Sequence, residues 1–178
     1  MPTPVDDVTL ELKTFREQIN HLARNKKTYV PLDHNACIVV VDYHNTHLQP
    51  DVYYATSANS AFTRNQQAVL EVAPVVPEPT WISQTDVNHR NHTEPKLFYN
   101  LIFDNLQMVS GAAVITLATE RDCCSSCLKN TLVQVKAVFK KLRPDVTFRV
   151  VEYAAQDNNG AAQWKTPSVS FFTPGASN

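Results

Sequence analysis

The fold of this chain is decided by the stretch that begins with His92-Thr93-Glu94 and ends with Cys124-Ser125-Ser126-Cys127. Just before the cysteines, residues 112–118 form an apolar run of strand length. After Cys127, apolar residues recur at the three- and four-residue spacing of a helix. The stretch therefore predicts a strand, a turn that carries two cysteines, and a helix.

A second helix is expected to begin at the histidine motif. Pro95 suits a first helical turn, and the apolar residues between 97 and 102 trace one helical face before Gly111. The interval from His92 to Cys124 is long enough for one helix, one turn and one strand. Two neighbouring parallel helices can therefore present their N-termini to a common point.

These two helix starts carry the donor atoms of a metal site. Cys124 and Cys127 are three positions apart, so both sulfurs lie on one face at the first turn of a helix. With the His92 imidazole they form a three-ligand set for zinc, which leaves a fourth position for water and leaves Glu94 able to move protons. We also expect the positive end of the helix to lower the pKa of the cysteine thiols.

Three runs together resemble the zinc-dependent nucleobase (cytidine) deaminase superfamily: His92 to Leu97, Thr119 to Cys127, and Phe139 through Val146. More narrowly, the chain is similar to the deaminase domains of bacterial polymorphic toxins, which carry HxEPK and TERxPCxxC runs. The similarity covers residues 35–172. Cys123 stands where that family has a proline before the first zinc cysteine.

The resemblance implies an α/β protein with the three-layer α/β/α cytidine-deaminase-like fold, built on a mixed five-stranded sheet with an antiparallel C-terminal hairpin. It implies one Zn²⁺ per chain, held by His92, Cys124 and Cys127, with Glu94 as the general acid and base. In such enzymes zinc activates a water molecule that attacks C4 of cytosine or C6 of adenine.

The chain is expected to form one domain with an added helix at its start. Apolar residues from Val8 to Leu22 recur along one face of a helix over residues 6–24. We therefore expect residues 1–30 to pack as an amphipathic helix on the domain, and residues 31–178 to form the deaminase domain.

The expected strands follow runs of β-branched and aromatic residues. The link before the last strand contains a turn signal at Asp157-Asn158-Asn159-Gly160 and is too short for a crossover helix, so the last two strands should be antiparallel. A short helix is expected over residues 60–72. The predicted strands are 36–41, 52–56, 112–118, 146–153 and 168–172.

Four side chains beyond the metal set are candidates for substrate binding: Tyr43, His44, Trp81 and Ser125. Tyr43 and His44 lie in the hairpin loop whose rim borders the substrate pocket in the superfamily. Ser125 lies between the two zinc cysteines. Trp81 could stack on a base, although a tryptophan in a proline-rich loop more often covers the core.

Two further histidine arrangements have alternatives. His44 and His47 are three positions apart and could hold a second metal, but a solvated loop is the favoured interpretation because no cysteine or carboxylate cluster accompanies them. His89 is the rival of His92 as a ligand. A purely structural zinc site would need Cys123 or His89 as its fourth ligand.

The composition says more about the compartment in which the protein works than about its substrate. The formal net charge of −1 does not indicate a nucleic-acid-binding protein, yet residues 90–149 carry nine basic and five acidic side chains, an excess that could attract phosphate. No apolar run reaches the ~18 residues of a membrane span, and the start lacks a signal-peptide pattern. Four cysteines, three of them clustered, favour a metal site in a reducing compartment.

The favoured function is hydrolytic conversion of cytosine to uracil in nucleic acid. Single-stranded DNA is the expected substrate, because a duplex hides the target base. As a toxin-type effector causing mutagenesis, the protein would act as a monomer in the cytoplasm of a target cell after secretion without a signal peptide. A cognate immunity protein would neutralise it, and no membrane association is expected.

Two other functions stay open from the residues alone. One is a deaminase of free nucleosides or bases. The other is a CxxC redox domain of the thioredoxin type, because a strand followed by CxxC and a helix also opens that fold. The redox interpretation does not explain His92-Thr93-Glu94.

Overall fold

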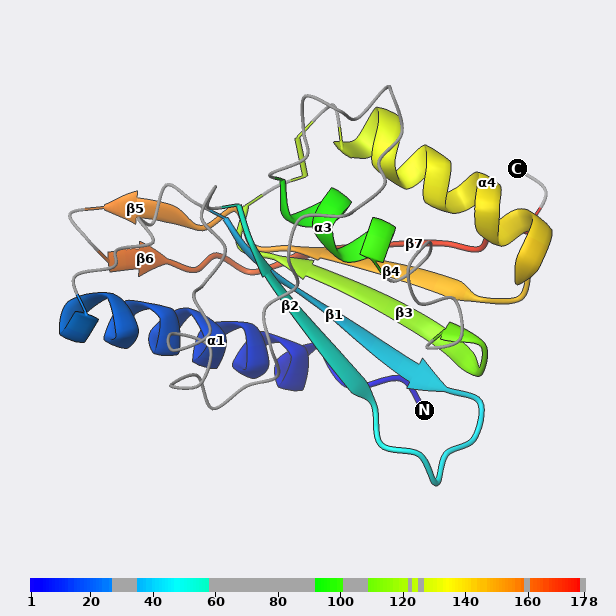
Figure 1. Cartoon of the computed structure of the whole chain (residues 1–178), viewed down its shortest axis with the longest axis horizontal. Helices are drawn as coiled ribbons and strands as arrows, with labels where there is room; N and C mark the ends of the chain where they lie inside the picture. The colour runs from blue at the N-terminus through cyan, green and yellow to red at the C-terminus, as the bar shows by residue number, and fades with distance from the viewer. Residues whose placement is uncertain are drawn as a thin grey trace.

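The computed structural model of the protein describes residues 1–26, 35–57, 92–100, 109–121, 123–124, 127–158 and 161–176. These residues form an α/β structure in which a five-stranded mixed sheet lies between helices (Figure 1). This agrees with the predicted α/β class. No helix in the described part of the chain is both long enough and apolar enough to cross a bilayer.

The central sheet has the strand order β2-β1-β3-β4-β7. Its central pair, β3 and β4, is parallel, and the other neighbouring pairs are antiparallel. The predicted antiparallel pairing of the last two strands is confirmed by β4 and β7. The strands are β1 (Ala36–Tyr43), β2 (Asp51–Thr56), β3 (Ala112–Thr119), β4 (Thr147–Glu152) and β7 (Ser168–Phe172).

The link between β4 and β7 forms a short hairpin of its own. Within it, β5 (Gln156–Asn158) pairs antiparallel with β6 (Ala161–Gln163) in a separate two-stranded sheet. The first two residues of the predicted turn signal, Asp157 and Asn158, belong to β5. The strands themselves were not predicted, because Ala161-Ala162-Gln163 contains no β-branched or aromatic residue.

One face of the sheet is covered by α1 (Val5–Lys26). Its apolar residues from Val8 to Ile19 are buried in a cluster with Ile38 and Val40 of β1. Burial of this apolar stripe stabilises the helix. The observed helix confirms the amphipathic helix predicted over residues 6–24. The predicted domain boundary between residues 30 and 31 lies outside the described residues.

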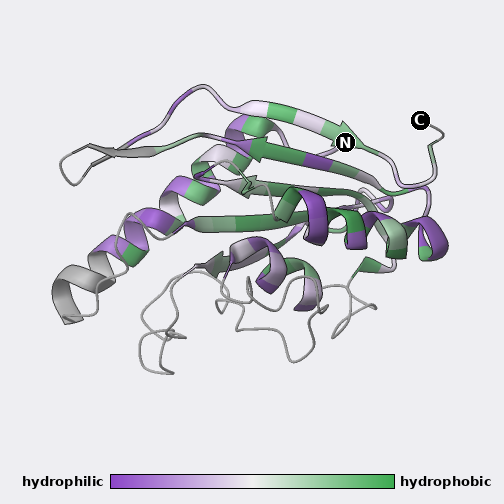
Figure 2. Cartoon of the chain, turned by 90° about the horizontal axis from the view of Figure 1, so that it is seen from above, coloured by the Kyte–Doolittle hydropathy of each residue, from purple (hydrophilic) through white to green (hydrophobic). Residues whose placement is uncertain are grey.

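The opposite face is covered by α3 (Thr93–Tyr99) and α4 (Leu132–Leu142), the latter preceded by the π-helical turn η4 (Cys127–Thr131). Leu97 of α3 and Phe139 of α4 belong to one buried cluster with Phe148 of β4. Phe139 and Phe148 meet edge to face with ring centroids 4.8 Å apart. Figure 2 shows the mainly hydrophobic strands between helices of mixed hydropathy.

Two other predicted elements cannot be compared with the structure. The helix expected over residues 60–72 lies outside the described residues, as do the positions 101–105 through which the helix at His92 was expected to continue.

Candidate metal centre

The centre lies at the end of the sheet where β3 finishes. The strand register pairs Ala36 at the start of β1 with Thr56 at the end of β2, and Cys37 with Thr119 at the end of β3. α3 begins directly after His92, and η4 begins at Cys127. Strand ends and helix starts that are distant in sequence therefore meet at one edge.

Three donor atoms converge there. The Nδ1 atom of His92 lies 3.5 Å from Cys124 Sγ and 3.4 Å from Cys127 Sγ, and the two sulfurs are 3.3 Å apart. Among the described residues, these three form the group that could hold a metal ion. A point equidistant from the three atoms lies roughly 2 Å from each, close to the ~2.3 Å and ~2.0 Å of zinc bonds to sulfur and nitrogen.

The backbone fixes the two cysteines relative to each other. The Leu128 N–H donates to the Cys124 carbonyl at 3.0 Å, so the helical turn already encloses Cys124. The Cys127 N–H points at Cys124 Sγ at 3.3 Å. The three-residue spacing therefore places both sulfurs on one side of the turn, as the sequence predicts.

A carboxylate stands beside the donors. Glu94 is 3% exposed, and its Oε2 atom accepts hydrogen bonds from the Thr93 hydroxyl at 3.0 Å and the Cys127 thiol at 3.5 Å. Its position in the first turn of α3 holds it next to His92 without making it part of the three-donor group. The centre thus combines three metal donors with one separate buried acid.

The Cys127 thiol of this centre is a poor acid in the metal-free protein. Burial, and after it the negative charge of Glu94, raises the pKa of Cys127 well above its ordinary value. The expected lowering of this pKa by the helix N-terminus is not found at Cys127, where burial raises the pKa instead. A thiolate forms here only with a compensating cation, so metal binding and thiol deprotonation are coupled.

Cys123 lies next to the donor group but does not belong to it. Its side chain is buried, and burial followed by the charge of Glu94 holds its pKa far above the usual range. Its backbone N–H donates to Glu152 Oε1 at 2.6 Å. A proline at this position could not make that bond, so the departure from the toxin-deaminase pattern has a local structural reason.

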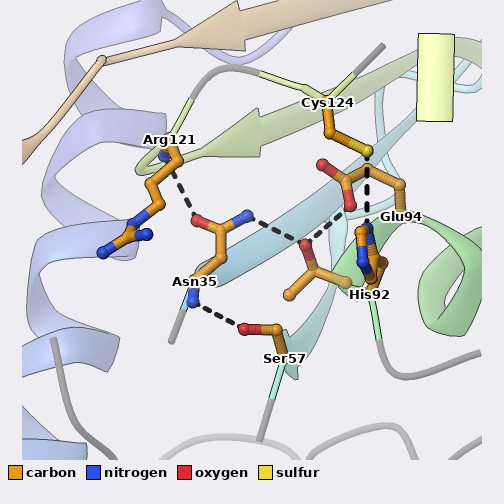
Figure 3. A pocket seen from close by; sticks show the side chains of 7 residues that line it. Asn35, Ser57, His92, Glu94, Arg121 and Cys124 are labelled. Carbon is orange, nitrogen blue, oxygen red and sulfur yellow. Dashed lines mark hydrogen bonds between the residues drawn. The ribbon is translucent and has the colours of Figure 1, made fainter. Parts of the chain in front are cut away.

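A cavity of about 270 Å³ opens beside the three donors (Figure 3). In Figure 3, His92, Glu94 and Cys124 lie together at one end and Arg121 lies at the other. The middle is polar, with hydroxyl and amide groups from separate chain segments. Its lining residues are Asn35, Ser57, His92, Thr93, Glu94, Arg121 and Cys124.

Asn35, Ser57 and Arg121 were not identified from the sequence. Asn35 directly precedes β1, and its backbone exchanges hydrogen bonds with Ser57 at the end of β2: N–H to Oγ at 2.7 Å, and Ser57 N–H to its carbonyl at 2.9 Å. Asn35 and Ser57 belong to no motif, whereas Arg121 lies in the Thr119–Cys127 run. For Asn35 and Ser57 the only available signal was position, since each is next to an end of a predicted strand.

Tyr43 and His44 do not lie at this cavity, which corrects the expectation that they bind substrate there. The register places Tyr43 opposite Ala112, at the far end of β1 from Asn35. The Tyr43 hydroxyl donates to Asp51, and His44 Nε2 lies 3.3 Å from Asp145 Oδ2. β1 starts at the metal centre and runs away from it, so the loop after β1 lies at the opposite edge of the sheet.

The other candidate residues are divided between exposed and undescribed positions. His47 is exposed, and it belongs to no candidate metal group within the described ranges. Trp81, His89 and Ser125 lie outside the described residues, so their predicted roles stay predictions.

Comparisons of the chain with protein-family models, with curated proteins and with solved structures give no match.

Proposed function

We propose that this protein is a zinc-dependent hydrolytic deaminase that converts cytosine to uracil in nucleic acid, with single-stranded DNA as its preferred substrate. The observation that carries the proposal is the convergence of His92 Nδ1 and two cysteine sulfurs within 3.5 Å of one another, beside the buried Glu94. Sequence resemblance to toxin deaminases supplies the reaction. The five-stranded order with an antiparallel β7 supports the cytidine-deaminase-like arrangement.

The residues divide the chemistry between them. His92, Cys124 and Cys127 would hold the ion, and zinc, when bound, supplies a water molecule made acidic enough to attack carbon at neutral pH. Glu94 would take one proton from the attacking water and pass it to the ring nitrogen. It would then carry the remaining hydroxyl proton to the amine, which leaves as ammonia.

The size of the cavity supports a single base as the reacting unit. Its volume of about 270 Å³ is near the lower limit of ligand sites, ~300 Å³. A base must therefore be unpaired and separated from its neighbours to enter. Single-stranded nucleic acid provides such a base at the smallest cost in stacking and pairing energy.

The surface next to the site supports a polymer substrate over a free nucleoside. No acidic residue occurs between Cys123 and Pro144, whereas four lysines and one arginine do. Lys129, Lys136 and Lys140 fall on one stripe of the helix that starts at Cys127, with Lys129 and Lys140 exposed. A basic stripe that leads away from the metal centre suits a phosphate backbone.

The CxxC redox alternative is less well supported. A catalytic redox cysteine needs a low thiol pKa and access to solvent. In a CxxC pair the first cysteine, Cys124, would be that residue. A histidine nitrogen lies within 3.5 Å of both sulfurs and Glu94 is buried beside them, and a redox pair has no use for either group.

A toxin-type role is part of the proposal. The four cysteines are all free thiols, which suits action in the reducing cytoplasm of a target cell. The protein would work there as a monomer, with an immunity protein as its cognate partner. Expression without that partner should be toxic and should raise the frequency of C-to-T mutations, and Glu94→Ala should remove both effects.

The direct test is mass spectrometry of single-stranded DNA, duplex DNA, RNA and free nucleosides incubated with the zinc-loaded protein. We expect uracil in the single-stranded DNA, and none with Glu94→Ala, which should still bind one zinc per chain by elemental analysis. Turnover of free cytidine with no change in any polymer would favour the nucleoside alternative. An active Glu94→Ala protein would refute the mechanism.

A further inference from the structure

We propose that Thr93 and Asn35 form a positioning relay that holds Glu94 in its working orientation. Arg121 N–H donates to Asn35 Oδ1, Asn35 Nδ2 donates to Thr93 Oγ1, and Thr93 Oγ1 donates to Glu94 Oε2 (Figure 3). This inference rests on the proposed function, in which Glu94 moves protons. It assigns a role to two residues that are not among the metal donors.

One backbone donor sets the direction of the whole relay. The Arg121 N–H can only donate, and it points at Asn35 Oδ1 at 3.2 Å. The amide nitrogen of Asn35 must therefore face the other way, where it meets Thr93 Oγ1 at 2.9 Å and Thr119 Oγ1 at 2.7 Å. If the amide were turned by half a turn, Nδ2 would face the Arg121 N–H. Two donors would then oppose each other, and the hydrogen bond from Arg121 would be lost.

The direction at Thr93 follows from its single proton. Because Thr93 Oγ1 accepts from Asn35, its own proton is available for Glu94 Oε2, 3.0 Å away. The Cys37 thiol also neighbours Thr93 and could compete as a thiolate. Burial, and after it the charge of Glu94, raises the pKa of Cys37, so it stays protonated and does not take this proton.

The relay gives the two carboxylate oxygens of Glu94 different hydrogen-bonding partners. Oε2 accepts from Thr93 and, in the metal-free protein, from the Cys127 thiol. Metal binding deprotonates that thiol, so Thr93 is the donor that remains on Oε2 in the working state. Among the residues that the structure describes, no hydrogen bond is made to Oε1. Anchoring one oxygen leaves the other for proton transfer, and it prevents rotation of the carboxylate away from the cavity.

The relay is rigid because the backbone that carries Asn35 and the helix that carries Thr93 are both held in place. The Asn35 backbone is held by Ser57 through two hydrogen bonds of 2.7 and 2.9 Å. Thr93 is the first residue of α3 and is buried. Preorganisation of this kind matters because a misplacement of about 1 Å can cost ~10²-fold in rate.

Thr93→Val tests the relay, because it removes the hydroxyl at nearly constant shape. We expect kcat to fall by about 10- to 100-fold with KM within about threefold of wild type. Zinc content and thermal midpoint should stay near wild type, and Thr93→Ser should restore kcat. Asn35→Asp should lose activity similarly, because an oxygen in place of Nδ2 would take the Thr93 proton from Glu94.

Thr119→Val is the matched control. It also removes a hydroxyl bonded to Asn35 Nδ2, together with the bond from Thr119 Oγ1 to the Arg121 carbonyl, but it leaves the path to Glu94 intact. We expect its kcat within about threefold of wild type. An equal loss in Thr119→Val and Thr93→Val would show a merely structural effect and overturn the relay.

A crystal structure of zinc-loaded Thr93→Val gives a readout that needs no activity. We expect the Glu94 carboxylate to be rotated or spread over two orientations. An unchanged Glu94 would overturn the relay even if the wild-type protein deaminates DNA. If wild type converts none of the substrates, the proposed function fails separately, and the orientation of Glu94 still decides for or against the relay.

Discussion

The Arg16 guanidinium of α1 and the Glu120 carboxylate at the end of β3 form a buried ion pair that links positions 104 residues apart. Arg16 Nε donates to Glu120 Oε1 at 2.6 Å, and the second guanidinium contact reaches Oε2. Glu120 Oε2 also accepts the Ala36 N–H at 2.8 Å. The pair therefore ties α1 to the backbone beside Asn35, at the edge that carries the metal centre.

Removing one partner of this pair should be strongly destabilising. Arg16→Met keeps much of the side-chain volume but leaves the Glu120 charge buried and unpaired, which should lower the unfolding free energy by about 3–5 kcal/mol. Urea denaturation followed by circular dichroism measures the change. The exposed neighbour Glu17 is the control, and Glu17→Gln should stay within about 0.5 kcal/mol. Equal stabilities of the two variants would contradict the role of the pair.

Cys123→Pro restores the residue of the toxin-deaminase pattern and should nonetheless destabilise this chain. It removes the N–H that donates to Glu152 Oε1 at 2.6 Å, at a cost of about 1.5–3 kcal/mol. Cys123→Ala keeps that N–H and should cost less. Both variants should bind one zinc per chain by elemental analysis, because Cys123 is outside the donor group. Loss of zinc in Cys123→Ala would instead make it a ligand.

Reversing charge on α4 should impair polymer substrates selectively. Lys136→Glu/Lys140→Glu should lower activity on single-stranded oligonucleotides by about tenfold or more at low salt, and leave activity on short substrates unchanged. Lys13→Glu/Lys165→Glu is the matched control. Each pair contains one lysine over an aromatic ring, Lys136 on Phe172 and Lys13 on Trp164. Equal losses in both pairs would argue against a specific phosphate path.

The stability of the fold should decline in alkali through Tyr54. Burial, and then its hydrogen bond to Glu11 Oε1 at 2.5 Å, raises the pKa of the Tyr54 hydroxyl. Above about pH 10 the unfolded chain loses a proton that the folded chain retains, so the unfolding free energy falls as pH rises. Urea unfolding at pH 8 and pH 10.5 should show a smaller decline for Tyr54→Phe. An identical decline would place the effect on other groups.

The sequence by itself determined the elements and the donor set. The periodicity of α1, the apolar runs of β1 and β3, and the three-residue spacing of Cys124 and Cys127 are local properties, set by propensity and by side chains a few positions apart. The motif at His92 added the third donor from an earlier part of the chain. The antiparallel pairing of β4 and β7 also followed from local information, because a short link excludes a crossover helix.

Only the tertiary structure decided which side chains surround those donors. Asn35, Ser57 and Arg121 reach the cavity because β1 pairs antiparallel with both β2 and β3, which brings one end of each strand to the same edge. The same register sends Tyr43 and His44 to the opposite edge. Strand register and the Arg16–Glu120 pair depend on contacts between residues far apart in the chain, and no local pattern records them.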